Sequence, residues 1–214
     1  MKPPTGETSR RSFIGRAAGI GAVAAFGTPE LAAAEEWNLS WVDRVRKAKR
    51  KALFDAPTSA VVLDLAARYY DNLEKAYGKS ARGACAVLNF RTRAVSMGIA
   101  DAVWVKYPLG EDAKVTDPLT NAPSVRNVDW RIPEDKTKEG YGSIERLQML
   151  GAIVLVCDFA LGHLANRLAS KTGATKEAVH AEIRSNLVPG AMLVPSGIFG
   201  AAEAQNAGCA FIPA

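Results

Sequence analysis

The clearest pattern along the chain is a short apolar run followed at once by a helical pattern, over residues 147–164. Ile153–Val156 is rich in β-branched residues and follows Gly151, which predicts a strand buried on both faces. Apolar positions at helical spacing begin at Phe159, with Asp158 available as the N-cap. Cys157 is therefore expected between the carboxyl end of a strand and the start of a helix, where open parallel sheets bind ligands.

The same alternation of strand and helix patterns continues through most of the chain. Further strands are predicted over residues 84–90, 192–194 and 209–212, and helices over residues 37–54, 58–77, 91–105, 143–150, 175–183 and 198–206. Such alternation requires crossover connections and a parallel sheet that is covered on both faces. We expect an α/β protein, a three-layer α/β/α sandwich with a mainly parallel sheet of about five strands.

Two segments are expected to lie outside this sandwich. Residues 35–80 predict an N-terminal helical extension that precedes an α/β domain at residues 81–214. Residues 108–143 hold four prolines with little periodicity and predict a long loop insertion. Trp130 and Tyr141 offer side chains that would pack this insertion over a site or a neighbouring subunit, and a disordered excursion is the alternative.

The first 34 residues have the features of an export signal. The pair Arg10-Arg11 precedes a weakly apolar Gly/Ala-rich run from Ala17 to Phe26, and Ala32–Ala34 offers small residues for cleavage. These features predict a twin-arginine signal peptide at residues 1–34 and a periplasmic or otherwise exported protein. The alternatives are an ordinary basic leader and an uncleaved anchor. The apolar run is shorter than the roughly 20 residues that cross a bilayer, so we expect no stable membrane span.

Charge and motifs exclude several classes of function. The net charge of +5 is modest, and much of it falls in residues 44–51, which favours a solvated helix face over a nucleic-acid partner and leaves contact with anionic lipid open. The sequence has no G-x-G-x-x-G, Walker, H-E-x-x-H or C-x-x-C motif, so we expect no cofactor and no metal site. The two histidines, His163 and His180, are interpreted as structural or surface residues. Ser196 is interpreted as a helix cap.

Three cysteines remain as candidate nucleophiles: Cys85, Cys157 and Cys209. An odd number is not typical of a disulfide framework, so at least one thiol should be free or paired between chains. Backbone N–H groups at a helix start would favour a thiolate at Cys157, whereas the charge of Asp158 would oppose it. Packing is the alternative for Cys157 and the preferred interpretation for Cys85 and Cys209. The other possibility for these two is that either resolves or pairs with Cys157.

Three segments resemble one known family. They are AVLNFRTRAVSMGIADAVWVKY, LGAIVLVCDFAL and LVPSGIFGAAEAQNAGCAFIPA, and together they cover most of residues 84–214. In order and spacing they are similar to the DsrE/DsrF-like proteins of sulfur metabolism. The resemblance implies a compact α/β/α sandwich that forms homo-oligomers. It also implies that Cys157, which matches a family cysteine after a central strand, carries sulfur as a persulfide.

Two functions of different classes follow. In the first, the exported protein binds or relays reduced sulfur through Cys157, with Cys209 as a weak second candidate. Its partners would be a sulfur donor or acceptor protein or a small thiol. In the second, the protein is a non-enzymatic ligand-binding or assembly subunit, its pocket is covered by residues 108–143, and its cysteine is structural.

Overall fold

The computed structural model describes residues 37–58, 60–131 and 142–213. The chain divides into two units, Met1–Glu35 and Glu36–Ala214, and the description that follows concerns the second. The predicted signal peptide lies outside the described residues. In the described part of the chain, no helix is both long and apolar enough to cross a membrane.

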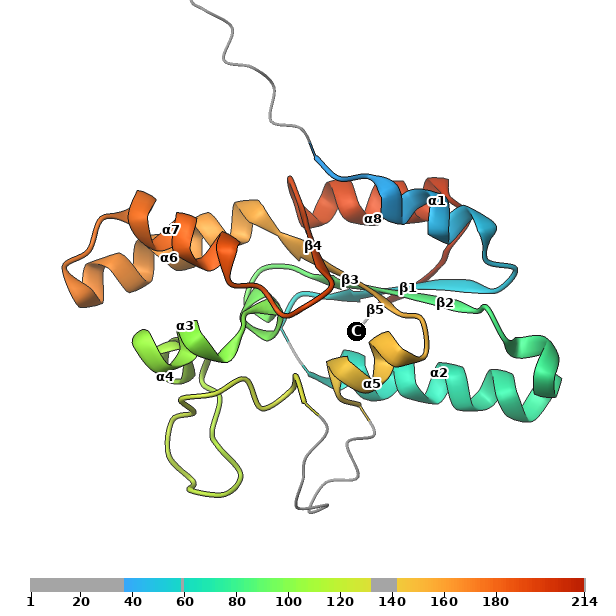
Figure 1. Cartoon of the computed structure of the whole chain (residues 1–214), viewed down its shortest axis with the longest axis horizontal. Helices are drawn as coiled ribbons and strands as arrows, with labels where there is room; N and C mark the ends of the chain where they lie inside the picture. The colour runs from blue at the N-terminus through green and yellow to red at the C-terminus, as the bar shows by residue number, and fades with distance from the viewer. Residues whose placement is uncertain (1–36, 59, 132–141, 214) are drawn as a thin grey trace, which may run out of the picture. The chain divides into compact units, whose positions relative to one another are not determined.

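Five strands form one parallel sheet, as expected (Figure 1). They are β1 (Lys51–Ala56), β2 (Cys85–Phe90), β3 (Ile153–Cys157), β4 (Ala191–Val194) and β5 (Ala210–Pro213), in the order β4-β3-β2-β1-β5. The register pairs Val87 with Ile153 and Cys157 with Val194. Because all strands run the same way, their carboxyl ends meet at a single edge of the sheet.

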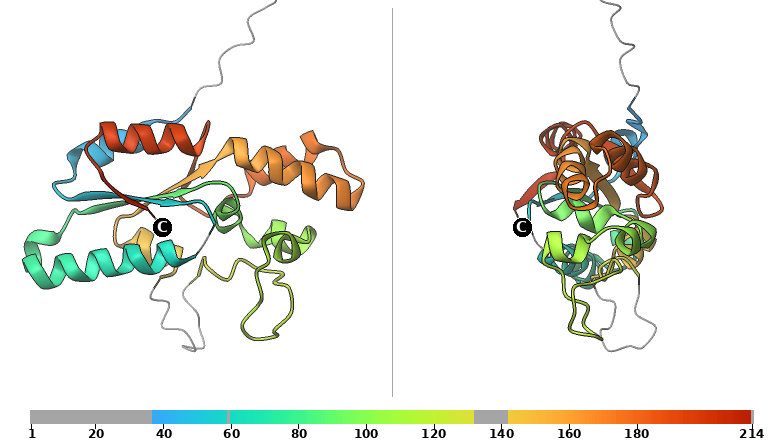
Figure 2. Two further views of the ribbon diagram at one scale, coloured as in Figure 1. Left: turned by 180° about the vertical axis from the view of Figure 1, so that it is seen from behind. Right: turned by 90° about the vertical axis from the view of Figure 1, so that its left-hand side faces the viewer.

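Helices cover both faces of the sheet. They are α1 (Ser40–Lys47), α2 (Val61–Tyr77), α3 (Asp101–Lys106), α4 (Leu109–Ala113), α5 (Ile144–Met149), α6 (Asp158–Thr172), α7 (Lys176–Ser185) and α8 (Gly197–Asn206), with 3-10 turns η1 (Gly78–Ala81) and η2 (Ala94–Gly98). Helices α1 and α8 lie on one face, and α2 and α5 lie on the other (Figures 1 and 2). The described unit is therefore a three-layer sandwich.

Alternating strand residues build a separate core on each face. Leu53, Val87 and Leu155 are buried with side chains of α1 and α8. Their neighbours Phe54, Leu88 and Val154 are buried with side chains of α2, α5 and α6. The apolar runs are nearly continuous because both sides of each strand are covered.

The helix predicted over residues 37–54 is wrong in its second half. Helix α1 ends at Lys47, and Lys51–Ala56 forms β1, which lies between β2 and β5. A run of six residues is too short for periodicity to separate a buried strand from a helix, so the pairing on both sides decides. Residues 35–80 are consequently not a purely helical extension, because they supply an internal strand.

The single helix predicted over residues 91–105 is also wrong. The segment forms η2 and α3, separated by Ile99 in an extended conformation. Ile99 makes an isolated antiparallel bridge with Leu187. A Cβ at Gly98 would lie within 2.4 Å of Val156 Cγ2, so the chain approaches β3 too closely here for a helix with ordinary side chains.

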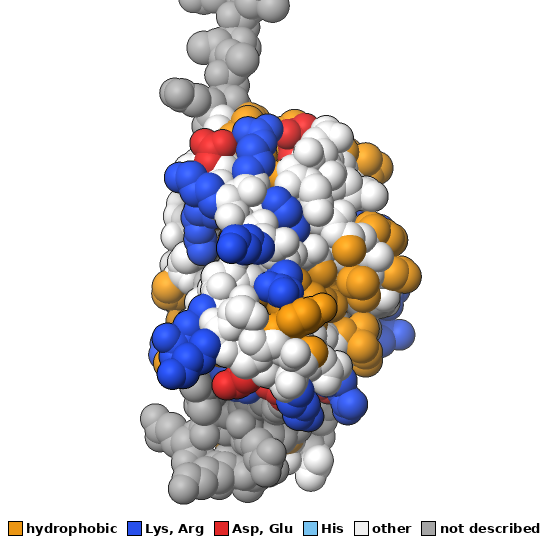
Figure 3. Space-filling view, turned by 90° about the vertical axis from the view of Figure 1, so that its right-hand side faces the viewer, with side chains coloured by type: hydrophobic (Ala, Val, Ile, Leu, Met, Phe, Trp, Pro, Cys, Tyr) orange, Lys and Arg blue, Asp and Glu red, His pale blue; other side chains and the backbone are white. Residues whose placement is uncertain are grey.

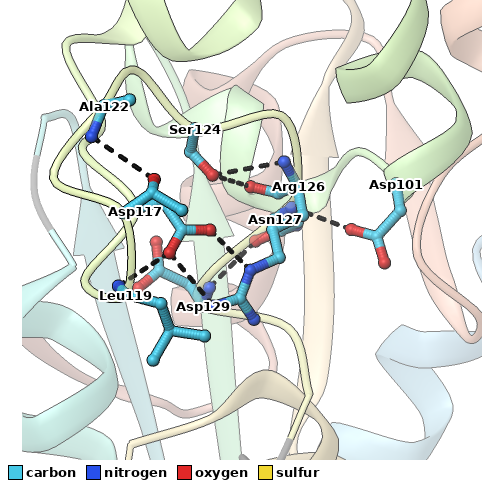
Figure 4. A network of polar contacts seen from close by, with 9 residues as sticks. Asp101, Asp117, Leu119, Ala122, Ser124, Arg126, Asn127 and Asp129 are labelled. Atoms are coloured by element: carbon cyan, nitrogen blue, oxygen red, sulfur yellow. Dashed lines mark hydrogen bonds and ion pairs between the residues drawn. The ribbon is translucent and has the colours of Figure 1, made fainter.

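Residues 108–131 contain more structure than the predicted loop (Figure 4). Besides α4, a network of polar side chains holds the segment: Asp117 accepts hydrogen bonds from Arg126 Nε at 2.7 Å and Leu119 N at 2.8 Å. Asn127 Nδ2 donates to the carbonyl oxygens of Met97 and Ile99 at 2.7 and 2.9 Å. Trp130 is buried in the core that also contains side chains of α2, α5 and α6, whereas Tyr141 lies outside the described residues.

Candidate functional site

Cys157 occupies the position that the sequence indicates, at the end of β3 and the start of α6. Its Sγ caps the helix by accepting a hydrogen bond from Ala160 N at 3.3 Å. The prediction that Asp158 is the cap is wrong because the helix begins one residue earlier. The carboxylate of Asp158 instead bonds to His180 Nε2 at 2.9 Å and approaches Arg184 Nε at 3.3 Å.

The chain leaves two neighbouring strands in opposite directions at this place. After β3 it enters α6, whose buried side chains join the core of the α2 face. After β4 it enters α8, whose buried Ala204 joins the core of the other face. Such a change of direction between adjacent parallel strands opens a crevice at their carboxyl ends, which is where α/β proteins bind ligands.

A cavity of about 570 Å³ lies in this crevice. Its wall combines the Cys157 thiol with three arginines, one carboxylate and an apolar rim. The lining residues are Arg91, Thr92, Arg93, Asp112, Cys157, Phe159, Ala160, His163, Arg167, Ser196, Gly197 and Ile198. Cys157 is only 4 % exposed, so the cavity is its route to small molecules.

Arg91, directly after β2, is fixed by Asp55 near the end of β1. The two side chains form a two-pronged ion pair, in which Nε is 2.9 Å and Nη2 2.7 Å from carboxylate oxygens. The hydrogen bond and charge of Asp55 raise the pKa of Arg91, although partial burial acts to lower it. Asn89 Nδ2 donates to both Asp55 Oδ1 and Gly197 O at 2.9 Å, which ties this pair to the start of α8.

Arg167 on α6 is held in the same way by Asp112 on α4. Its Nε lies 3.0 and 3.1 Å from the two carboxylate oxygens and its Nη2 lies 2.8 Å from one of them. Lys171 approaches the same carboxylate at 3.6 Å. Burial acts to raise the pKa of Asp112, but the hydrogen bonds and charges of Arg167 and Lys171 outweigh it and lower the pKa below 3.8.

The backbone between Arg91 and Arg93 is strained. Thr92 has a φ of 55°, in the left-handed region that a β-branched residue rarely occupies. Strain of this kind persists where the surrounding structure enforces it, and it concentrates at ligand sites. The turn therefore supports the view that this rim of the cavity is a binding site.

Two residues that the sequence analysis treated as structural also line the cavity. Ser196 caps α8 by accepting from Phe199 N at 3.1 Å, as predicted. His163 lies in the wall as well, with its ring edge-on to Phe159 at 4.8 Å between centroids. The sequence analysis missed the three arginines. Arg91 and Arg93 follow the strand at residues 84–90 directly, and this position could have identified them.

Cys85 and Cys209 lie at the opposite edge of the sheet and cannot pair with Cys157 within one subunit. Cys85 begins β2 and Cys209 precedes β5. From the β2–β3 register, Cys85 and Cys157 are six residues apart along the strands, about 20 Å. Burial raises the pKa of Cys85 and raises that of Cys209 to about 12.

A second cavity, of about 500 Å³, lies at this amino-terminal edge between the end of α2, η1 and Leu150. Figure 3 looks onto this end and shows Lys and Arg side chains spread over it, with hydrophobic side chains gathered to one side. The lining includes Arg82 and an ion pair between Arg146 and Asp71 at 3.5 Å. Among the lining residues of this cavity there is no cysteine or histidine.

Over the described ranges, no three His, Cys, Asp or Glu side chains are grouped so that they could hold a metal ion. Comparison of the chain with protein-family models, with curated proteins and with solved structures gives no match. The function must therefore be argued from the geometry of the Cys157 cavity.

Proposed function

We propose that this protein is an exported, DsrE-like carrier of reduced sulfur that holds a sulfur atom as a persulfide on Cys157. One observation supports this above the others: the Cys157 Sγ accepts a backbone hydrogen bond at a helix start and also lines an open cavity. Backbone N–H donors and the positive end of the helix dipole stabilise a thiolate, which is the nucleophilic form of cysteine.

The transfer needs no external oxidant or reductant. The Cys157 thiolate attacks the sulfane sulfur of a donor, so that an Sγ–S bond forms and the bond from that sulfur to the rest of the donor breaks. The leaving group departs with the electron pair, as sulfite does from thiosulfate. An acceptor thiolate then attacks the outer sulfur of the persulfide and releases the Cys157 thiolate. The partners would be a small thiol or a donor or acceptor protein.

The export of the protein is part of the same proposal. Arg10-Arg11, the weakly apolar run and Ala32–Ala34 support passage through the twin-arginine route. Replacing both arginines with lysine is expected to leave the uncleaved precursor inside the cell. Unchanged export and cleavage of that variant would contradict the proposed route.

Mass spectrometry of the intact protein tests the carrier function. After exposure to thiosulfate or polysulfide, the wild-type protein should gain the mass of one sulfur atom, which dithiothreitol should remove. Cys157→Ser should gain nothing, whereas Cys209→Ser should behave as the wild type does. An unmodified wild-type protein, or an adduct that survives in Cys157→Ser, would overturn the proposal.

The apolar rim of the cavity favours a second candidate function, that of a homo-oligomeric assembly or ligand-binding subunit. Phe159 and Ile198 are 67 % and 81 % exposed, and both line this cavity. Exposed apolar side chains at a cavity mouth are typical of interaction sites. Light scattering on the wild type and on Ile198→Asp tests this candidate. The wild type should be an oligomer, and Ile198→Asp should be a monomer. A monomeric wild type would contradict assembly through this rim.

A further inference from the structure

The Cys157 cavity contains an unusual concentration of fixed positive charge. Arg91, Arg93 and Arg167 all line it, and Asp112 is the only carboxylate among its lining residues. These three arginines come from two different places in the sequence, the turn after β2 and the second half of α6. The fold therefore brings them together beside the thiol.

Arg91 and Arg167 are held by the same edge of the guanidinium group. In each, a carboxylate accepts from Nε and Nη2, and Nη1 makes no hydrogen bond to any described residue. The side chains of Asp55 and Asp112 are only 8 % and 7 % exposed, so these clamps are built into the fold. Each arginine is thereby fixed in orientation while three of its five N–H donors, two of them on Nη1, stay available on the side away from its carboxylate.

The surrounding charges do not cancel. Arg91, Arg93 and Arg167 line the cavity and Lys171 lies beside Asp112, whereas Asp55 and Asp112 are the carboxylates that face them. The sum is two positive charges when the Cys157 thiol is neutral and one when it is a thiolate. Arg93 has no side-chain partner among the described residues, although it is exposed and lines the cavity. A compact, doubly charged oxyanion complements this arrangement in charge and in hydrogen-bonding geometry, since guanidinium groups bind planar pairs of anionic oxygens.

We propose that the cavity is an oxyanion-binding site in which Arg91, Arg93 and Arg167 hold a sulfate-like group beside the Cys157 thiol. The site itself does not depend on the reactivity of the cysteine. The class of substrate that the site selects rests on the proposed function. The site would favour sulfur donors whose sulfane sulfur is attached to a sulfonate, such as thiosulfate, over uncharged polysulfanes. The sulfonate oxygens would lie on the arginines, and the sulfane sulfur would face Sγ.

Calorimetric titration with sodium sulfate, an unreactive probe, tests the site. At constant ionic strength set with chloride, sulfate should bind to the wild type, and to Cys157→Ser at least as tightly, because the serine brings no negative charge into the cavity. Arg93→Gln should weaken binding at least about tenfold, and it should fold normally because the Arg93 side chain is exposed and bonds to no other side chain in the described part of the chain. Arg46→Gln, which removes an exposed arginine of α1, is the matched control and should bind as the wild type does.

Several results would overturn the inference. They are no sulfate binding above the chloride background, equal affinity in Arg93→Gln, and weaker binding in Arg46→Gln. Phosphate that binds about tenfold more tightly than sulfate would keep the anion site but reject the sulfonate donor class. The outcomes separate the two proposals: sulfate binding without persulfide formation defeats only the carrier function, whereas persulfide formation without sulfate binding defeats only the oxyanion site.

Discussion

The two edges of the sheet offer thiols in opposite chemical settings. At the carboxyl edge, Cys157 Sγ accepts a helix N–H and lines a cavity with three arginines. At the amino edge, Cys85 and Cys209 are buried, and their thiols show pKa values raised by desolvation even though Lys51 acts against the rise. All three cysteines are more than nine-tenths buried, so burial alone does not distinguish them.

The difference comes from the direction of the strands. In a parallel sheet the carboxyl ends of the strands face the amino ends of the following helices, whose N–H groups and dipoles favour anions. Residues at the amino ends of the strands face the carboxyl ends of helices and loops, where no such donors converge. One sheet thus provides one edge suited to a thiolate and an anionic ligand and another that serves packing.

The largest expected effect is on thiol reactivity. At pH 8, a pKa of about 12 leaves roughly one Cys209 thiol in 10⁴ as thiolate. Iodoacetamide should therefore modify Cys157 at least about 100-fold faster than Cys209, and faster than Cys85, in the folded protein. Peptide mapping over time measures the three rates, and guanidinium-unfolded protein, in which they should be similar, is the control. Equal rates in the folded state would remove the contrast between the edges.

Gly197→Ala should displace Arg91 at the carboxyl edge of the sheet and leave the amino edge unchanged. An added Cβ would lie 2.6 Å from Arg91 Cβ and 2.9 Å from its Cδ, so the arginine must move. We expect sulfate affinity to fall about tenfold. Gly162→Ala on α6 is the matched control, because its nearest neighbours are His180 ring atoms at 4.0 Å and alanine favours a helix. Unchanged affinity in Gly197→Ala would show that the position of Arg91 is unimportant.

Cys85→Ala should lower the stability of the protein but leave sulfate binding and persulfide formation unchanged. Its side chain packs in the core beneath α1 and α8, so its loss should lower the free energy of unfolding by about 1–2 kcal/mol. Sulfate affinity and persulfide formation should stay at the wild-type level. Chemical denaturation measures the free energy of unfolding. The sulfate titration and the mass spectrometry of the intact protein measure the affinity and the persulfide. A loss of persulfide in a folded Cys85→Ala protein would place the amino edge in the mechanism.

The smallest effect concerns Asp112 and the pH dependence of stability. Its folded-state pKa lies below the ordinary value, so it contributes stability above that value, and the contribution disappears as the pH falls through the folded-state pKa. Asp112→Asn should therefore lose less than about 1 kcal/mol at pH 7, since Arg167 is half exposed, and this difference should shrink below about pH 4.

Urea unfolding between pH 3 and pH 7 measures the Asp112 effect. Asp43→Asn, which removes the partner of Arg46 in an exposed ion pair on α1, is the control and should change little at any pH. A difference for Asp112→Asn that grows on acidification would contradict the assignment of the Arg167 and Lys171 contacts as stabilising.

Local patterns in the sequence were sufficient for most elements and for the position of Cys157. The run Ile153–Val156, the helical spacing after it and the cap Ser196 are local features, and the structure confirms each of them. They could be predicted because capping and periodicity depend on residues within a few positions of one another.

Contacts between distant residues decided the rest. Lys51–Ala56 becomes a strand because β2 and β5 pair with it on both sides, and Ile99 leaves the helical path to pair with Leu187. The sequence by itself determined a parallel α/β sandwich with a cysteine after a buried strand. Only the tertiary structure placed Arg91 and Arg167 around that cysteine, because each depends on a carboxylate more than 30 residues away along the chain.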